Sequence, residues 1–329
     1  MSPSSPAEVS GLLAFLDASP TPYHAAAEAA RRLGAGGSEA LDLTAAWPVA
    51  PDRGHVLVDG ALVAWHLPPA GPPAPALRLV GAHTDSPGLR IKPRPDTGTA
   101  GWRQLGVEVY GGALVNSWLD RDLGLAGRVA VRGPDGVEVR LVRIDRPLLR
   151  VPQLAIHLDR EVTTKGLRLD RQRHLTPVWG VGPVDPGGLA RVLGTELDVA
   201  PDRLAGWDLM VHDLAPATLV GAAQELVSSG RLDDLCCAWA AVTALAGGAE
   251  ATGAPTTGAV VVLFDHEEVG SGSTRGAEGT LLATVLERLV VARGGTRDDL
   301  LRALAGAALA SADMAHATHP NHAERHEPD

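Results

Sequence analysis

The sequence predicts an α/β protein in which a β-rich unit interrupts one α/β domain. Residues 77–82 form a short, mostly apolar strand, and residues 260–264 form a continuous apolar run, which is the pattern of a strand buried on both faces of a parallel sheet. Residues 105–150 instead hold several short strand-like runs with no long helical pattern between them. An insertion explains the order α/β, mostly β, α/β better than two consecutive domains do. We expect the three segments to be 1–95, 96–225 and 226–329.

The other elements follow from apolar spacing and from turn residues. Residues 55–67 alternate like a β-hairpin around Asp59 and Gly60, and an apolar segment over 301–310 leads into Asp313. Helical spacing predicts two segments within 10–34, longer helices over 236–246 and 281–292, and short ones over 186–194 and 215–229.

Composition excludes several classes of protein. The 329 residues are 45% hydrophobic, which rules out a disordered chain. The net charge of -10 argues against a nucleic-acid partner, whose footprint would be basic. The two cysteines, Cys236 and Cys237, are adjacent and cannot form a disulfide framework. No apolar stretch approaches 18 residues and the start has no signal-peptide pattern, so we expect a cytoplasmic protein without a membrane partner.

Polar side chains follow the predicted strands at several points. His83 and Asp85 stand just past the run 77–82, where sites form in α/β sheets, although a plain polar loop is the alternative. A histidine can bind a metal while a nearby aspartate fixes its tautomer. Asp233 and Asp234 precede a helix, so they either cap it or bridge two metal ions.

Adjacent glutamates directly after a buried strand form the most unusual motif. Glu267 and Glu268 follow the run 260–264, and carboxylates placed so closely are costly unless a cation lies between them. One glutamate can bind a metal while the other takes a proton from water. A solvated acidic turn is the alternative. Asp313 also follows an apolar segment, and the histidines after it form either further ligands or a polar tail. Together these motifs predict two divalent ions at the strand ends of one domain.

Seven segments, in order along the chain, resemble the M18 metallopeptidases, the aspartyl aminopeptidases. They are 15–25, 81–87, 118–123, 155–160, 231–235, 264–271 and 313–321. The resemblance implies a cytosolic exopeptidase with two zinc ions, which removes an N-terminal Asp or Glu from peptides. It also implies a zinc-exopeptidase-type α/β catalytic domain interrupted by a β-rich dimerisation domain, and homo-oligomers built from dimers, dodecamers in the family.

The resemblance assigns a role to each motif residue. His83 and Asp313 match ligands of the first zinc, Asp233 the bridging ligand and Glu268 a ligand of the second zinc. Glu267 matches the general base, and Asp85 the residue that orients His83. His157, in the inserted domain, matches a histidine that reaches the active site of a neighbouring subunit.

Two departures from the family pattern matter. Asp234 stands where the family often has Asn. Family members also continue past the last motif, into a segment with basic residues for the acidic side chain and a histidine for the second zinc. We therefore expect a catalytic domain truncated at its C-terminus, with little or no turnover. The alternatives are a catalytically impaired homologue with an oligomerisation or regulatory role, and a related dinuclear hydrolase of other specificity.

Overall fold

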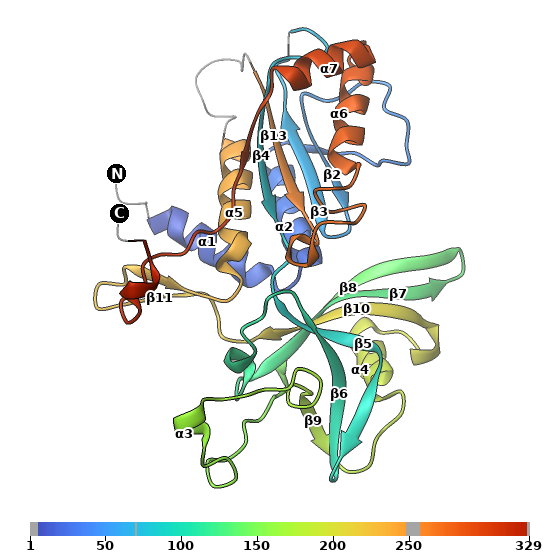
Figure 1. The fold of residues 1–329 in the computed structure, drawn as a ribbon. Coiled ribbons are helices and arrows are strands. Elements are labelled where there is room, and N and C mark those ends of the chain that lie inside the picture. Colours follow the sequence, from blue (N-terminus) through green and yellow to red (C-terminus); the bar gives the residue numbers. More distant parts are fainter. Residues whose placement is uncertain (1–5, 70, 248–256, 328–329) are drawn as a thin grey trace.

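The computed structural model describes residues 6–69, 71–247 and 257–327, and it contains two six-stranded sheets (Figure 1). The predicted α/β class is confirmed, because helices cover both faces of one sheet while the other sheet is antiparallel. In order across the first sheet, the strands are β1 (Glu39–Ala40), β2 (Arg53–Val58), β3 (Ala61–His66), β13 (Gly258–Phe264), β4 (Leu77–His83) and β14 (Ala308–Ser311).

The first sheet brings three strand ends to the same edge. Strand β4 lies between β13 and β14 and runs parallel to both. Its register pairs His83 with Phe264, and Gly81 with Ser311. The residues that follow these strands are therefore neighbours in space, although the strands end at His83, Phe264 and Ser311, far apart in the chain.

Helices cover both faces of the first sheet because its central strands are apolar on both sides. In β13, Val260 and Val262 join one buried cluster, whereas Val261 and Leu263 join another. The second of these clusters includes side chains of α1 (Pro6–Ala18), α2 (Pro22–Ala35) and α5 (Leu232–Gly247). The first includes side chains of α6 (Leu281–Ala292) and α7 (Arg297–Ala305). The helix predicted over 281–292 has these bounds.

The second sheet lies below the first in Figure 1, and each of its neighbouring strand pairs is antiparallel. In order across the sheet, the strands are β8 (Gly136–Leu149), β7 (Leu123–Gly133), β10 (Leu204–Asp213), β5 (Gly88–Thr99), β6 (Trp102–Tyr110) and β9 (Val178–Val181). It has a core of its own, to which α4 (Gly188–Leu197) contributes Leu189 and Leu193. The remaining short helices are α3 (Val162–Lys165), η1 (Val115–Trp118), η2 (Pro201–Arg203), η3 (Glu267–Val269) and η4 (Ala323–Arg325).

The helix expected over 215–229 is wrong. Strands β11 (Thr218–Val220) and β12 (Leu226–Ser228) pair there as an antiparallel hairpin. Gly221 and Gln224 between them have φ of 103° and 57°, left-handed values that end a strand and do not continue a helix.

The division into 1–95, 96–225 and 226–329 remains our proposal for the domain boundaries. The strands of the second sheet lie between Gly88 and Asp213 in the chain, and those of the first sheet lie on both sides of them. None of the helices in the described parts combines the length and the apolar character needed to cross a membrane.

Candidate metal centre

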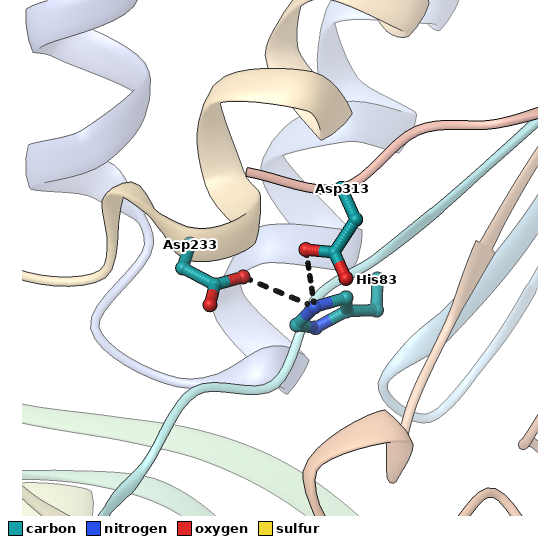
Figure 2. A group of neighbouring side chains, drawn as sticks. All are labelled: His83, Asp233 and Asp313. Carbon is teal, nitrogen blue, oxygen red and sulfur yellow. Dashed lines mark ion pairs between the residues drawn. The ribbon is translucent and has the colours of Figure 1, made fainter. Parts of the chain in front are cut away.

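Three distant segments of the chain place one histidine and two aspartates together (Figure 2). His83 ends β4, Asp233 lies in the first turn of α5, and Asp313 comes two residues after β14. One ligand atom from each residue lies within 4.8 Å of the other two. His83 is buried while both aspartates are exposed, so the group opens to solvent on the aspartate side.

The geometry of this group fits a zinc ion. The Nε2 atom of His83 lies 3.3 Å from Oδ1 of Asp233 and 3.8 Å from Oδ1 of Asp313. Donor atoms about 2.0–2.2 Å from a tetrahedral ion are about 3.3–3.6 Å from one another. An imidazole nitrogen and two carboxylate oxygens are donors that zinc accepts, and three protein ligands leave one position for water or substrate.

The charges of the cluster also favour a cation. Burial raises the pKa of Asp233, and the carboxylate of Asp313 raises it further. Burial by itself would lower the pKa of His83, but Asp85 and the other acidic groups around the ring raise it to about 9. Carboxylates held this close repel one another, and a divalent ion between them removes that repulsion more completely than a proton does.

Asp85 holds the far side of the His83 ring. Its side chain is fully buried, and its Oδ1 lies 3.4 Å from Nδ1 of His83. It accepts hydrogen bonds from the backbone N–H groups of Glu267 and Glu268 at 3.1 Å each, and from the Tyr110 hydroxyl at 2.7 Å. Burial would raise the pKa of Asp85, but these bonds and the His83 ring hold it below its usual value. Because Nδ1 faces Asp85, Nε2 is the nitrogen available to a metal.

Glu267 and Glu268 follow β13 on η3 and occupy different surroundings. An oxygen of Glu267 lies 3.8 Å from Nε2 of His83, so this carboxylate borders the point where the ligand atoms converge. Glu268 packs against Gly111, where an added Cβ would lie 3.1 Å from the glutamate side chain. Burial, and then the charge of Asp233, raises the pKa of Glu268 to about 7.

The sequence reasoning missed Tyr110, and it considered Asp234 only as a helix cap or a bridging ligand. Tyr110 ends β6 of the second sheet, yet its hydroxyl binds Asp85. Asp234 is fully buried, and its Oδ2 accepts a hydrogen bond from the backbone N–H of His83 at 3.0 Å. Asp234 therefore ties the end of β4 to the start of α5, which goes beyond capping a helix. The only sequence signal for Tyr110 is its place at the end of a strand, before Gly111 and Gly112.

His157 is exposed, on the stretch of chain just before α3. In Figure 1, α3 lies on the side of the second sheet that faces away from the first sheet. No ion pair found among the described residues connects His157 with the His83 group. Its role in a neighbouring subunit stays a prediction.

A cavity of about 580 Å³ opens beside Asp233, with walls from strands β5 and β10 of the second sheet, from the chain between β4 and β5, and from the chain around the start of α5. Two cations on its walls already have partners. Arg121 forms an ion pair with Asp213, and Nε of the buried Arg231 donates to the carbonyl oxygen of Ser19 at 3.0 Å. The walls also include Pro20, Pro22, Ser86, Trp118, Met210 and His316.

Fold and site together are those expected of an α/β metallohydrolase, with candidate metal ligands that include residues at the carboxyl ends of parallel strands. A sequence model of the family described as "Aminopeptidase I zinc metalloprotease (M18)" matches residues 15–329. The chain therefore belongs to the M18 family of zinc metallopeptidases, and the predicted resemblance is confirmed.

Individual relatives agree with this assignment. The chain is 54% identical over 318 residues to the "Probable M18 family aminopeptidase 2" of Streptomyces coelicolor, a match that covers 96% of this chain and 73% of that protein. The cryo-EM structure of the Ape4 and Nbr1 complex matches with a TM-score of 0.90 at 33% identity, over 99% of this chain and 68% of that one. The S. cerevisiae mApe1 dodecamer matches with a TM-score of 0.83 at 26% identity, over 98% and 76%.

Proposed function

We propose that this chain is an aminopeptidase that uses two zinc ions to remove an N-terminal aspartate or glutamate from peptides. The observation that carries the proposal is the convergence of His83, Asp233 and Asp313 in a chain of the M18 family. In this proposal these three residues hold the first zinc ion, and Asp233 with Glu268 holds the second. Bound zinc would supply Lewis acidity, which polarises the scissile carbonyl and acidifies water.

The chain's own residues account for the proton transfers. Glu267 takes a proton from the attacking water and later delivers it to the leaving amine, which its place beside the ligand cluster supports. Asp85 keeps the His83 ring oriented through its backbone carbonyl oxygen, 3.0 Å from Nδ1, and through its carboxylate, whose Oδ1 lies 3.4 Å from the same nitrogen. His157 of a neighbouring subunit would donate a hydrogen bond to the oxyanion, for which its exposure leaves it available.

The cavity beside Asp233 supports a peptide as substrate. It has room for the residues that follow the scissile bond, and both apolar and polar groups line it. The cations on its walls, Arg121 and Arg231, are bonded to other groups. The preference for acidic residues is therefore proposed from the family resemblance and not from these two arginines.

Matched peptides test the function directly. Peptides that differ only in an N-terminal Asp, Glu, Asn or Leu are incubated with the zinc-loaded protein, and release of the first residue is measured. The proposed function requires release of Asp and Glu and much slower release of the isosteric, neutral Asn, whereas the little or no turnover expected from the sequence would favour the impaired homologue described below. Equal rates for Asp, Asn and Leu would refute acidic selectivity while leaving an aminopeptidase.

A catalytically impaired homologue is the second candidate. It is favoured because Glu268 lies outside the one group of converging ligands found in the described parts of the chain. Zinc stoichiometry separates the two: the dinuclear enzyme binds two ions tightly, and the impaired homologue one.

We also propose that the chain forms homo-oligomers, with the dodecamer of S. cerevisiae mApe1 as support. Sedimentation in solution measures this separately from catalysis. The cytoplasmic location stays a prediction, which fractionation of expressing cells would test.

A further inference from the structure

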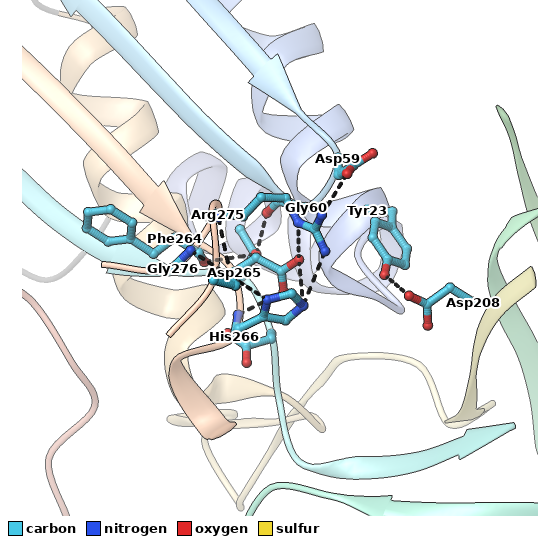
Figure 3. A network of polar contacts seen from close by, with 12 residues as sticks. Tyr23, Asp59, Gly60, Asp208, Phe264, Asp265, His266, Arg275 and Gly276 are labelled. Atoms are coloured by element: carbon cyan, nitrogen blue, oxygen red, sulfur yellow. Dashed lines mark hydrogen bonds and ion pairs between the residues drawn. The ribbon is translucent and has the colours of Figure 1, made fainter. Parts of the chain in front are cut away.

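A network of charged residues lies behind the loop that carries Glu267 and Glu268 (Figure 3). Arg275 is its centre, and its guanidinium contacts three partners. Nε donates to Asp265 at 3.2 Å, Nη1 donates to Asp59 at 2.8 Å, and Nη2 lies 3.3 Å from Nε2 of His266. The Arg275 side chain is only 16% exposed and Asp265 is buried, whereas the contact with Asp59 lies at the surface.

The loop that Arg275 contacts does not hold its shape by local preference. His266 and Ser271, on either side of the two glutamates, have φ of 69° and 59°, left-handed values that are unfavourable for residues other than glycine. Such a backbone persists only where surrounding contacts over-determine it. Arg275 supplies several of them, because its carbonyl also accepts a hydrogen bond from the backbone N–H of Asp265 at 3.1 Å.

His266 adds further contacts to this loop. Its Nε2 lies 3.3 Å from Nη2 of Arg275 and 3.5 Å from Oδ2 of Asp265. Its Nδ1 lies 2.7 Å from Oγ of Ser273, and this oxygen accepts backbone N–H bonds from Arg275 and Gly276 at 3.3 and 3.1 Å. These contacts connect residues within the segment 265–276 to one another around the guanidinium of Arg275.

The same network continues into the second sheet. Asp59, in the β2–β3 turn, also forms an ion pair with Arg128 of β7. The guanidinium of Arg128 lies 4.5 Å from the centre of the Tyr23 ring. Arg275 and Arg128 therefore share one carboxylate, and that carboxylate connects the glutamate loop with the inserted sheet.

We propose that Arg275 is a positioning residue for the metal centre: it holds the loop of Glu267 and Glu268 in place, and through Asp59 and Arg128 it ties that loop to the second sheet. The inference rests on the proposed roles of the two glutamates as base and zinc ligand. Because the backbone N–H groups of both glutamates hold Asp85, a displaced loop would disturb both the glutamates and the orientation of His83.

The test compares Arg275→Gln with a matched control, Arg293→Gln. Arg293 is also largely buried, at 11% exposure, and also joins a carboxylate and a loop: Asp52 at 3.1 Å and the carbonyl of Pro68 at 2.8 Å. It lies outside the metal centre. Three readouts are measured on the full chain: zinc affinity by chelator competition, hydrogen exchange of fragments covering 264–276, and thermal stability.

We expect both variants to lose a similar amount of thermal stability. Only Arg275→Gln should weaken zinc binding, by about 10–100-fold, and speed exchange over 264–276. Arg275→Lys keeps the charge but contacts fewer partners, so its zinc affinity and its exchange over 264–276 should lie between those of the wild type and those of Arg275→Gln. Arg128→Gln should also speed hydrogen exchange over 264–276, but less than Arg275→Gln does.

Equal zinc affinity and exchange in Arg275→Gln and Arg293→Gln would overturn the positioning role. Unchanged exchange in Arg128→Gln would overturn the link to the second sheet. Where the proteins turn over peptide, kcat should fall in Arg275→Gln with KM little changed. A wild-type chain that binds zinc without turnover would refute the aminopeptidase, while zinc affinity and exchange would still decide the role of Arg275.

Discussion

The hydroxyl of Tyr110 is predicted to contribute to zinc affinity although it is not itself a ligand. Tyr110→Phe removes the 2.7 Å hydrogen bond to Asp85 and keeps the ring. Burial raises the pKa of Tyr110, so the hydroxyl is a donor at every physiological pH. A hydrogen bond to a buried charged group contributes about 1.5–3 kcal/mol.

The lower end of that range applies here because Asp85 keeps its two backbone donors. About 1.5 kcal/mol corresponds to roughly a tenfold change in an equilibrium constant. We therefore expect zinc affinity to fall about tenfold in Tyr110→Phe, as Asp85 holds the His83 ring less firmly. Competition with a chromophoric chelator measures this change.

The chain's other tyrosine provides the control. Tyr23 also donates from its hydroxyl to an aspartate, Asp208, at 2.5 Å, and this aspartate is not part of the His83, Asp233 and Asp313 group. Tyr23→Phe keeps the ring beneath Arg128 and should lose stability without losing zinc affinity. If the two Phe variants bind zinc equally well, the orienting role of Asp85 and Tyr110 is refuted.

Three further predictions concern the base, the pH dependence of stability and the packing of the loop. Glu267→Gln should abolish peptide hydrolysis and leave bound zinc unchanged; loss of zinc instead would mean that the roles of the two adjacent glutamates are exchanged. Burial lowers the pKa of His24 to about 4, so the folded state keeps this ring neutral while the unfolded chain protonates it near 6.5. The contribution of His24 to the free energy of unfolding is thus complete above pH 6.5 and is lost as the pH falls to 4, by up to about 3 kcal/mol. In urea unfolding across this range, the free energy of unfolding should decline less steeply in His24→Gln than in the wild type. Gly60→Ala would place a Cβ 2.5 Å from the buried Asp265 carboxylate, so we expect a loss of about 1–3 kcal/mol in urea unfolding, and an unchanged midpoint would contradict the close packing.

Much of the architecture could be predicted because buried strands and helices have recognisable patterns of apolar residues in the sequence. The run 260–264 is apolar at every position, and β13 is indeed covered on both faces. Residues 281–292 form the predicted helix because their apolar spacing matches a single buried stripe. The hairpin of β11 and β12 could not be predicted in this way, because these short strands are mostly exposed and their turn depends on backbone angles.

The candidate ligands could be found because His83, Glu268 and Asp313 follow apolar runs and Asp233 precedes an apolar helix. Parallel strands end at the same edge, so His83 and Asp313 had to be neighbours once β4 and β14 paired. The residues that support the candidate ligands, Tyr110 and Arg275, have no such signal in the sequence. Tyr110 and Arg275 reach the centre from another sheet and from a loop, and their contacts depend on how separate parts of the chain pack together.

The sequence by itself determined which residue types stand at the strand ends, and therefore the prediction of a metal site and the resemblance to the family. Those features are local, since an apolar strand and the polar residues after it are contiguous in the chain. Only the tertiary structure decided that Asp85 is held by three donors, that Asp234 supports the backbone of His83, and that Asp59 is shared by Arg275 and Arg128. The physical reason is that a buried charge must find its partners wherever the fold places them, often far away in the sequence.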